Sequence, residues 1–266
     1  MKRSVTAVVL AAFLAAGCSI FADKEAAKKD WGAKEYYEAA KQVMDEGQWS
    51  NAVKLYEQLE SKFPFGRYAQ QAALETAYCY YKENDTAQAV TTIDRFLKSH
   101  PNHANVDYAL YLKGLANFKE DLGPLGGLAR QDLADRDPKA ARESFEIFKD
   151  LVARFPESRY SADARRRMEY LVDALARHEV HVAQYYLRRG AYLAAVNRSQ
   201  DVLIRYPNTV ARKDALDVMV EAYDRMGMAD LRDDTKKVLV RNFPADPLGK
   251  QGSNRSGWFS WLPWYK

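Results

Sequence analysis

The sequence predicts an all-α protein, built as an α-solenoid of about five helix pairs. Two repeated marks support this fold class. A bulky ring precedes proline at five places, Phe63-Pro64, His100-Pro101, Phe155-Pro156, Tyr206-Pro207 and Phe243-Pro244. A turn-forming residue stands 17 positions before four of these prolines, at Gly47, Asn84, Gly190 and Gly227. Because proline cannot continue a helix and Gly or Asn commonly ends one, the shared offset indicates a repeated helix–turn–helix unit.

Small residues recur at two places in this unit. When each proline is counted as position 32 of a unit of about 34 residues, position 20 holds Ala52, Ala89, Ser144 and Ala195. Position 8 holds Ala40, Ala77, Ala183 and Val220. Small side chains let two helices cross closely. The pattern resembles the tetratricopeptide repeat over about residues 33–245, which implies a right-handed solenoid of stacked helix pairs.

Two stretches depart from the repeat spacing. Residues 120–137 are rich in glycine and contain a proline, which indicates an exposed loop of the kind that often carries binding groups. Residues 161–189 contain no Gly or Pro and predict one helix of about 43 Å, a spacer between the two halves of the array. We therefore expect three repeats over 33–156, the long helix and two repeats over 157–245, and a flexible aromatic-rich tail over 246–266.

The start of the chain resembles a bacterial lipoprotein signal. A positive start precedes an apolar stretch too short to span a bilayer, and Leu14-Ala15-Ala16-Gly17-Cys18 resembles a lipobox. This pattern predicts a signal peptide over 1–17, a covalent lipid on Cys18 and a lipidated tether over 18–32. Ser19 is not the aspartate that retains such proteins on the inner membrane. The resemblance therefore implies the inner leaflet of the outer membrane, facing the periplasm. The alternative is an ordinary secretory signal whose cleavage site contains a cysteine.

Composition and polar residues argue against several classes of function. The chain carries a formal charge of +4, and removing Lys2 and Arg3 with the signal leaves 38 basic and 36 acidic side chains, a field too weak to predict nucleic-acid binding. No catalytic motif is present, so we expect no enzyme, no metal and no cofactor apart from the lipid on Cys18. Cys79 is then a lone thiol, and we expect it to be buried. Two histidine pairs lack the further ligands of a zinc site, His100 with His103 and His178 with His181.

Tyrosines gather at positions that would line a groove. In tetratricopeptide arrays the first helices of successive units line a concave face, and residues i, i+3, i+7 and i+10 share one helix face. By this resemblance the candidate substrate-binding residues are Tyr37, Leu74, Tyr78, Tyr81, Tyr108, Tyr111 and Phe118. Tyrosine offers a large contact area with a polar tip, which suits an extended peptide. The alternative is that these rings fill the seams between repeats.

Several segments resemble the BamD family of outer-membrane assembly lipoproteins. They include Phe63-Pro64-Phe65-Gly66-Arg67-Tyr68, Asp135-Arg136-Asp137-Pro138 and Val196-Asn197-Arg198. The resemblance implies a scaffold subunit of the β-barrel assembly machinery, the BAM complex, which folds and inserts outer-membrane β-barrel proteins. The implied partners are unfolded barrel proteins at the first repeats, and the central barrel subunit with smaller lipoproteins at the last. Arg198 matches an arginine that the family uses at the barrel-subunit contact; the alternative is a salt bridge within the repeat.

Two other functions remain open at this point. One is a periplasmic adaptor on the same solenoid that binds peptidoglycan or takes part in DNA uptake. The other is an enzyme that uses the histidine pairs, which would need a bound metal. The tail adds a separate hypothesis, because Trp258 to Tyr265 is rich in rings that settle at membrane interfaces. It predicts a second contact with lipid or with a partner groove, unless the end is disordered.

Overall fold

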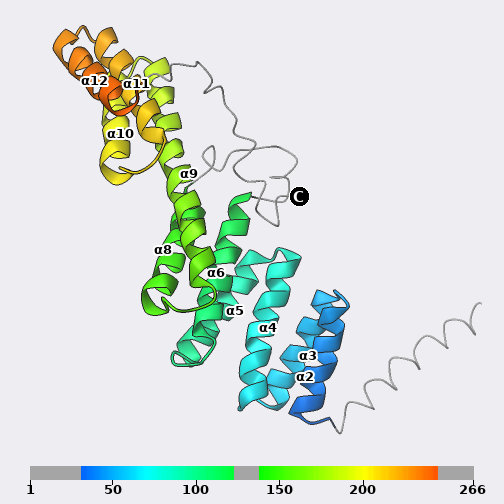
Figure 1. The fold of residues 1–266 in the computed structure, drawn as a ribbon. Helices are drawn as coiled ribbons and strands as arrows, with labels where there is room; N and C mark the ends of the chain where they lie inside the picture. Colours follow the sequence, from blue (N-terminus) through cyan, green and yellow to red (C-terminus); the bar gives the residue numbers. More distant parts are fainter. Residues whose placement is uncertain (1–30, 123–137, 245–266) are drawn as a thin grey trace, which may run out of the picture. The chain divides into compact units, whose positions relative to one another are not determined.

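The computed structural model describes residues 31–122 and 138–244, and every regular element within these ranges is an α-helix (Figure 1). The all-α prediction is therefore confirmed. The signal peptide, Cys18, most of the tether, residues 123–137 of the insertion and the tail lie outside the described residues. The helices in chain order are α2 (Ala33–Asp45), α3 (Trp49–Lys62), α4 (Arg67–Glu83), α5 (Thr86–Ser99), α6 (Val106–Leu122), α8 (Lys139–Arg154), α9 (Ser161–Arg188), α10 (Tyr192–Arg205), α11 (Ala211–Arg225) and α12 (Ala229–Asn242).

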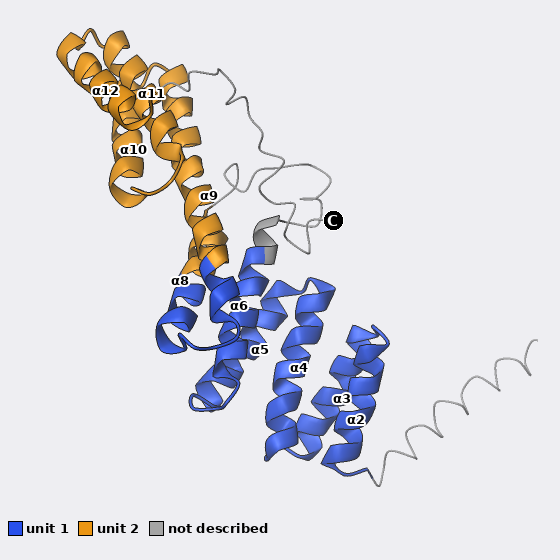
Figure 2. Cartoon of the chain, in the orientation of Figure 1, with its two compact units in different colours: residues 1–123, 146–165 blue, residues 124–145, 166–266 orange. Residues whose placement is uncertain are grey.

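The chain divides into two compact units (Figure 2). Unit 1 comprises residues 1–123 and 146–165, and unit 2 comprises residues 124–145 and 166–266. The division runs within α8 and α9, so each of these helices contributes to both units. α9 contains 28 residues, about 42 Å at the usual helical rise. The prediction of one uninterrupted helix after Pro156 is confirmed, and it ends one residue earlier than expected.

The ring before each repeated proline ends a helix. The backbone N–H groups of these rings donate to the carbonyl four residues earlier at 2.8 to 3.0 Å, in Phe63, His100, Phe155, Tyr206 and Phe243. A following proline disfavours the helical conformation at the preceding residue. The ring therefore closes the last helical hydrogen bond but cannot extend the helix, as the sequence predicted.

The turn signals also occupy the backbone conformation that explains them. Gly47, Asn84, Gly190 and Gly227 all have positive φ, between 63° and 77°. Glycine adopts this left-handed region without steric cost, and asparagine tolerates it better than most residues. Each turn thus reverses the chain after the first helix of its pair.

In unit 1 each helix packs on the next, from α2 through α6. In addition α2 contacts α4 and α4 contacts α6, so the first helices of successive pairs lie side by side. Tyr36 and Tyr56 fill the seam between α2, α3 and α4, and Ile93 and Phe96 fill the next one. A Cβ on Gly114 would overlap the Phe148 ring, so the missing side chain lets α6 approach α8 closely.

In unit 2 the seams are filled mostly by smaller side chains. α11 packs on α10 and on α12, and α9 joins them through Ala176, Val180 and Ala183. The predicted close-contact positions are fully buried in both units, at Ala52, Ala89, Ser144 and Ala195. Position 8 follows the same rule at Ala40, Ala77 and Ala183, whereas Val220 remains partly exposed.

Candidate functional site

Five of the seven predicted groove residues reach the surface of unit 1. Tyr37 on α2, Tyr78 and Tyr81 on α4, and Tyr108 and Tyr111 on α6 are all partly exposed. We call these five tyrosines the aromatic surface. Because α2, α4 and α6 are neighbours within unit 1, the helices that carry it are adjacent.

Leu74 and Phe118 correct the groove prediction. Leu74 has no exposed surface and Phe118 is only 4% exposed, so neither side chain is available to a partner. Leu74 belongs to the core between α4, α5 and α6. Helical spacing shows which residues share a face, but it does not show which of them a neighbouring element covers.

Three further rings, which were not predicted from the sequence, pack against tyrosines of the aromatic surface. The Trp49 ring meets Tyr78 edge-on with centroids 6.0 Å apart, and Tyr68 lies 5.6 Å from Tyr37. The Tyr160 ring stacks on Tyr111 with centroids 4.8 Å apart. Trp49 begins a second helix and Tyr160 precedes α9, so neither falls at a groove position of the repeat.

Hydrogen bonds fix the α6 end of the aromatic surface. The Tyr111 hydroxyl donates to Oδ2 of Asp163 at 2.7 Å, and the Ser158 hydroxyl donates to Oδ2 of Asp107 at 2.6 Å. The first bond joins α6 to the first turn of α9, and the second joins α6 to the turn before α9, both within unit 1. A ring held in this way loses little conformational entropy when it contacts a ligand.

Two tyrosines of this surface have a raised pKa. Burial and the adjacent Glu75 carboxylate raise the pKa of Tyr37 to about 12. Burial, followed by the Glu75 charge, also raises the pKa of Tyr108. The Lys82 ammonium lies 5.3 Å from the Trp49 centroid and 6.0 Å from that of Tyr78, which adds positive charge beside the rings.

Arg198, the predicted partner contact, lies on α10 in unit 2. Its Nη1 donates to Oε2 of Glu179 at 3.2 Å, so the alternative of a salt bridge within the repeat is present. The side chain is nevertheless 43% exposed, which leaves it accessible to a partner as well. Arg205 and Arg142 also contact Glu179. This cluster was not predicted from the sequence, although a carboxylate between Ala176, Val180 and Ala183 on an apolar helix face is a signal for a buried ion pair.

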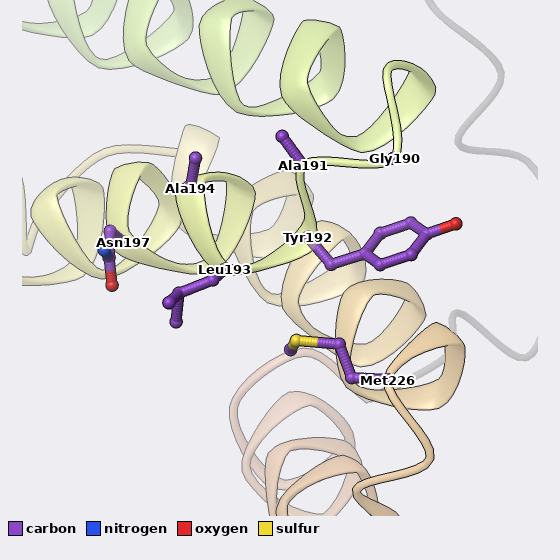
Figure 3. A pocket seen from close by; sticks show the side chains of 7 residues that line it. All are labelled: Gly190, Ala191, Tyr192, Leu193, Ala194, Asn197 and Met226. Carbon is purple, nitrogen blue, oxygen red and sulfur yellow. The ribbon is translucent and has the colours of Figure 1, made fainter.

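A pocket of about 540 Å³ adjoins this part of α10 (Figure 3). Leu193 and Asn197 project from the same side of the helix, and Met226 lies at the end of α11 (Figure 3). The full lining is Gly190, Ala191, Tyr192, Leu193, Ala194, Asn197 and Met226. Asn197 directly precedes Arg198 on α10, but consecutive helical residues point about 100° apart, so the pocket and the arginine face different sides of the helix.

His100, His103 and Cys79 have structural explanations. His100 and His103 pack against the Phe96 ring with centroids 5.3 and 5.2 Å away, and Nδ1 of His103 accepts from the Asn105 N–H. Within residues 31–122 and 138–244, no group of three or more His, Cys, Asp or Glu side chains is placed to hold a metal ion. Cys79 is fully buried, as expected, and burial raises the pKa of its thiol to about 12.

Comparison with known proteins decides the family. A model of the YfiO family, described as outer membrane lipoprotein, matches residues 29–239. The chain belongs to this family of outer membrane lipoproteins. Relatives named "Outer membrane protein assembly factor BamD" agree. The family member from Neisseria meningitidis serogroup B (MC58) is 46% identical and aligns over 92% of this chain and 90% of its own.

Other members of the family show the same coverage. The Neisseria gonorrhoeae protein of the same name is 46% identical over 93% of this chain and 94% of its own. The Vibrio cholerae protein is 36% identical over 91% of this chain and 99% of its own.

Among solved structures, a MamA double mutant is 16% identical over 80% of this chain and 97% of its own, with a TM-score of 0.37. None of the described helices is both long and apolar enough to cross a membrane.

Proposed function

We propose that this chain is a non-catalytic scaffold subunit of the machinery that assembles β-barrel proteins into the outer membrane. The extent of the similarity carries this proposal. Relatives named as outer membrane protein assembly factors align with 91% to 93% of the chain, which includes the aromatic surface of unit 1 and the Arg198 region of unit 2. The function would then consist of binding and positioning, without bond chemistry.

Unit 1 would bind the unfolded β-barrel substrate. The aromatic surface supports this role, because partly exposed rings held by neighbouring helices give a peptide contact area at low entropic cost. An extended segment with alternating aromatic residues could place its rings against these tyrosines. The substrates would be outer-membrane proteins before they close into barrels.

Unit 2 would hold the central barrel subunit, and the smaller lipoproteins would dock there too. The half-exposed Arg198 supports this assignment, since an arginine fork can form two hydrogen bonds with a partner carboxylate. On another face of the same helix, Leu193 is 66% exposed and lines the pocket, so it would supply a separate apolar contact. Specific protein interfaces combine apolar and charged contacts.

The chain would work from the outer membrane. Family membership and the lipobox-like segment that ends at Cys18 support a lipid anchor in the inner leaflet, with both units in the periplasm. Three acyl chains on the cysteine would anchor the chain stably, whereas a single chain binds a bilayer only marginally.

The alternatives are less well supported. A peptidoglycan or DNA-uptake adaptor is not favoured, because the relatives with 36% to 46% identity are named as outer membrane protein assembly factors. An enzyme based on His100 and His103 has little support either, because both partly exposed rings pack on the buried Phe96 of unit 1.

The proposed function is tested by co-purification from detergent-extracted membranes. Arg198→Glu should lower recovery of the central barrel subunit about tenfold or more, because it places a carboxylate where the partner's acidic group would bind. Arg225→Glu is the matched control, since Arg225 also pairs with a glutamate in unit 2 but lies on α11. Recovery of the barrel subunit at the wild-type level with Arg198→Glu would exclude this contact.

A further inference from the structure

Glu179 is a buried carboxylate in unit 2. It lies on α9, is only 3% exposed, and has the fully buried Ala176 and Ala183 three residues before and four residues after it. An ionised carboxylate in such a position is costly unless charged partners surround it. The position therefore requires an explanation beyond helix packing.

Three guanidinium groups from two other helices supply the partners. Nη1 of Arg198 lies 3.2 Å from Oε2, and Nη2 of Arg205 lies 3.1 Å from Oε1. Nη2 of Arg142, on α8, lies 3.5 Å from Oε1. All four residues belong to unit 2. Both carboxylate oxygens are thus occupied, and Glu179 joins α8, α9 and α10.

The arginines are more numerous than the carboxylates they contact. Arg205 also pairs with Asp201 at 3.5 Å, so among the described residues three guanidinium groups face two carboxylates and the cluster keeps one net positive charge. The arginine side chains are 43%, 44% and 51% exposed. The buried Glu179 therefore contacts one side of each guanidinium group, and the other side is accessible to solvent.

The spacing of the two α10 arginines makes them a pair. Arg198 and Arg205 are seven residues apart, about two helical turns, and so lie on the same face of α10. In isolation such long side chains would sample many rotamers. Their shared bond to one buried carboxylate draws both guanidinium groups toward a single point.

We propose that Glu179 is a positioning residue that presets Arg198, Arg205 and Arg142 as a cationic docking surface for a carboxylate-bearing segment of a protein partner. This inference rests on the proposed function and extends it, because that function uses Arg198 alone. Prior fixation lowers the entropy lost on binding, and guanidinium groups match carboxylates in a bidentate geometry. A surplus of one charge suits a short acidic segment better than a polyanion.

The test measures binding of the full-length chain to the purified periplasmic region of the central barrel subunit. Glu179→Gln keeps the shape of the side chain and removes its charge, and we expect about tenfold weaker binding. Arg205→Gln should weaken binding about threefold to tenfold, and because this residue is half-exposed the variant tests the surface even if Glu179→Gln folds poorly. Glu221→Gln is the control, since Glu221 pairs with Arg225 on the exposed face of α11.

Testing Glu179→Gln in a variant that already lacks two of the arginines shows whether Glu179 acts by positioning them or by stabilising the fold. In the Arg198→Gln/Arg205→Gln double variant, Glu179→Gln should weaken binding by less than twofold further, because the side chains it positions are already absent. A full tenfold loss in that background would show that Glu179 acts through the fold and would overturn the proposal. Tighter binding by Glu179→Gln alone would overturn it too, because Glu179 would then compete with the partner.

The same experiment keeps the two proposals apart. If Arg198→Glu binds the barrel subunit normally, the partner contact of the proposed function is wrong. If Arg198→Glu weakens binding but both Glu179→Gln and Arg205→Gln bind as the wild type does, only the positioning role is wrong. Weakening in all three variants, with the Glu221→Gln control unchanged, supports both.

Discussion

Unit 1 and unit 2 repeat the same helix–turn–helix plan but fill it with different side chains. Among the described residues, the fully buried aromatic rings all belong to unit 1, and they are Tyr36, Tyr56, Phe96 and Phe148. The two core clusters of unit 2 consist mostly of alanine and valine, together with Leu216, Met219 and Tyr223, which is 8% exposed. Large rings bury more apolar area for each residue, whereas small side chains rely on close helix contact. One repeat pattern is therefore compatible with two kinds of core.

The electrostatics of the units differ in the same way. In unit 1, burial raises the pKa values of Tyr37 and Cys79 to about 12. In unit 2, a hydrogen bond from the ammonium to Asp217 raises the pKa of Lys213, and the Arg232 guanidinium lowers that of Asp224. Desolvation thus dominates in unit 1 and charge pairing in unit 2.

The largest effect should come from emptying the core of unit 1. Phe148→Ala should lower the free energy of unfolding by about 3–5 kcal/mol, because it leaves a cavity beside Gly114, where no side chain can fill the space. Val202→Ala, the fully buried counterpart in unit 2, should cost only about 2 kcal/mol. Urea unfolding of both variants measures the difference. Phe65→Ala is the control, because Phe65 is 90% exposed. Equal losses for Phe148→Ala and Val202→Ala would remove the contrast between the cores.

Alkaline pH should destabilise unit 1 next. The Cys79 thiol has an ordinary pKa of 9.0 and a folded pKa of about 12, so the unfolded chain loses this proton first. The stability contributed by the neutral thiol is complete below pH 9 and falls as pH rises toward 12, by about 1.4 kcal/mol per pH unit for each such group. Urea midpoints between pH 8 and 10.5, with the first proteolytic cuts mapped by mass spectrometry, measure the loss.

The alkaline loss has its own control. Tyr37→Phe removes one group with a raised pKa and should make the decline with pH shallower. First cuts within α10–α12, and not within α2–α6, would contradict the assignment of the pH sensitivity to unit 1.

The smallest effect should appear in substrate binding. Tyr78→Ala combined with Tyr111→Ala should weaken crosslinking of peptides from the carboxyl ends of barrel proteins about tenfold, or about 1.4 kcal/mol, because two contact rings are lost. Tyr80→Ala is the matched control on the same helix, where its hydroxyl donates to Glu57 outside the aromatic surface. Arg198→Glu should leave this crosslinking unchanged. Undiminished crosslinking in the Tyr78/Tyr111 variant would return both rings to a packing role.

Features that depend on residues close together in the sequence were predicted correctly, whereas features that depend on distant helices were not. The ring–proline stops, the four positive-φ turns and the long α9 were all predictable, because they depend on the conformational preferences of neighbouring residues. The small residues at helix crossings were predictable from the repeat itself. Leu74 and Phe118 were placed wrongly, because helical spacing identifies a face but does not say which neighbouring helix covers it.

The helices, their turns and the close crossings follow from the amino-acid order, since each depends on local backbone preferences or on a repeated spacing. Which groove residues reach the surface, and which partners Glu179 has, depends on how the helices pack. Its three arginines lie between 19 and 37 residues away and on two other helices, so no local pattern brings them together. Desolvation makes their pairing necessary, and desolvation arises only when the helices have packed.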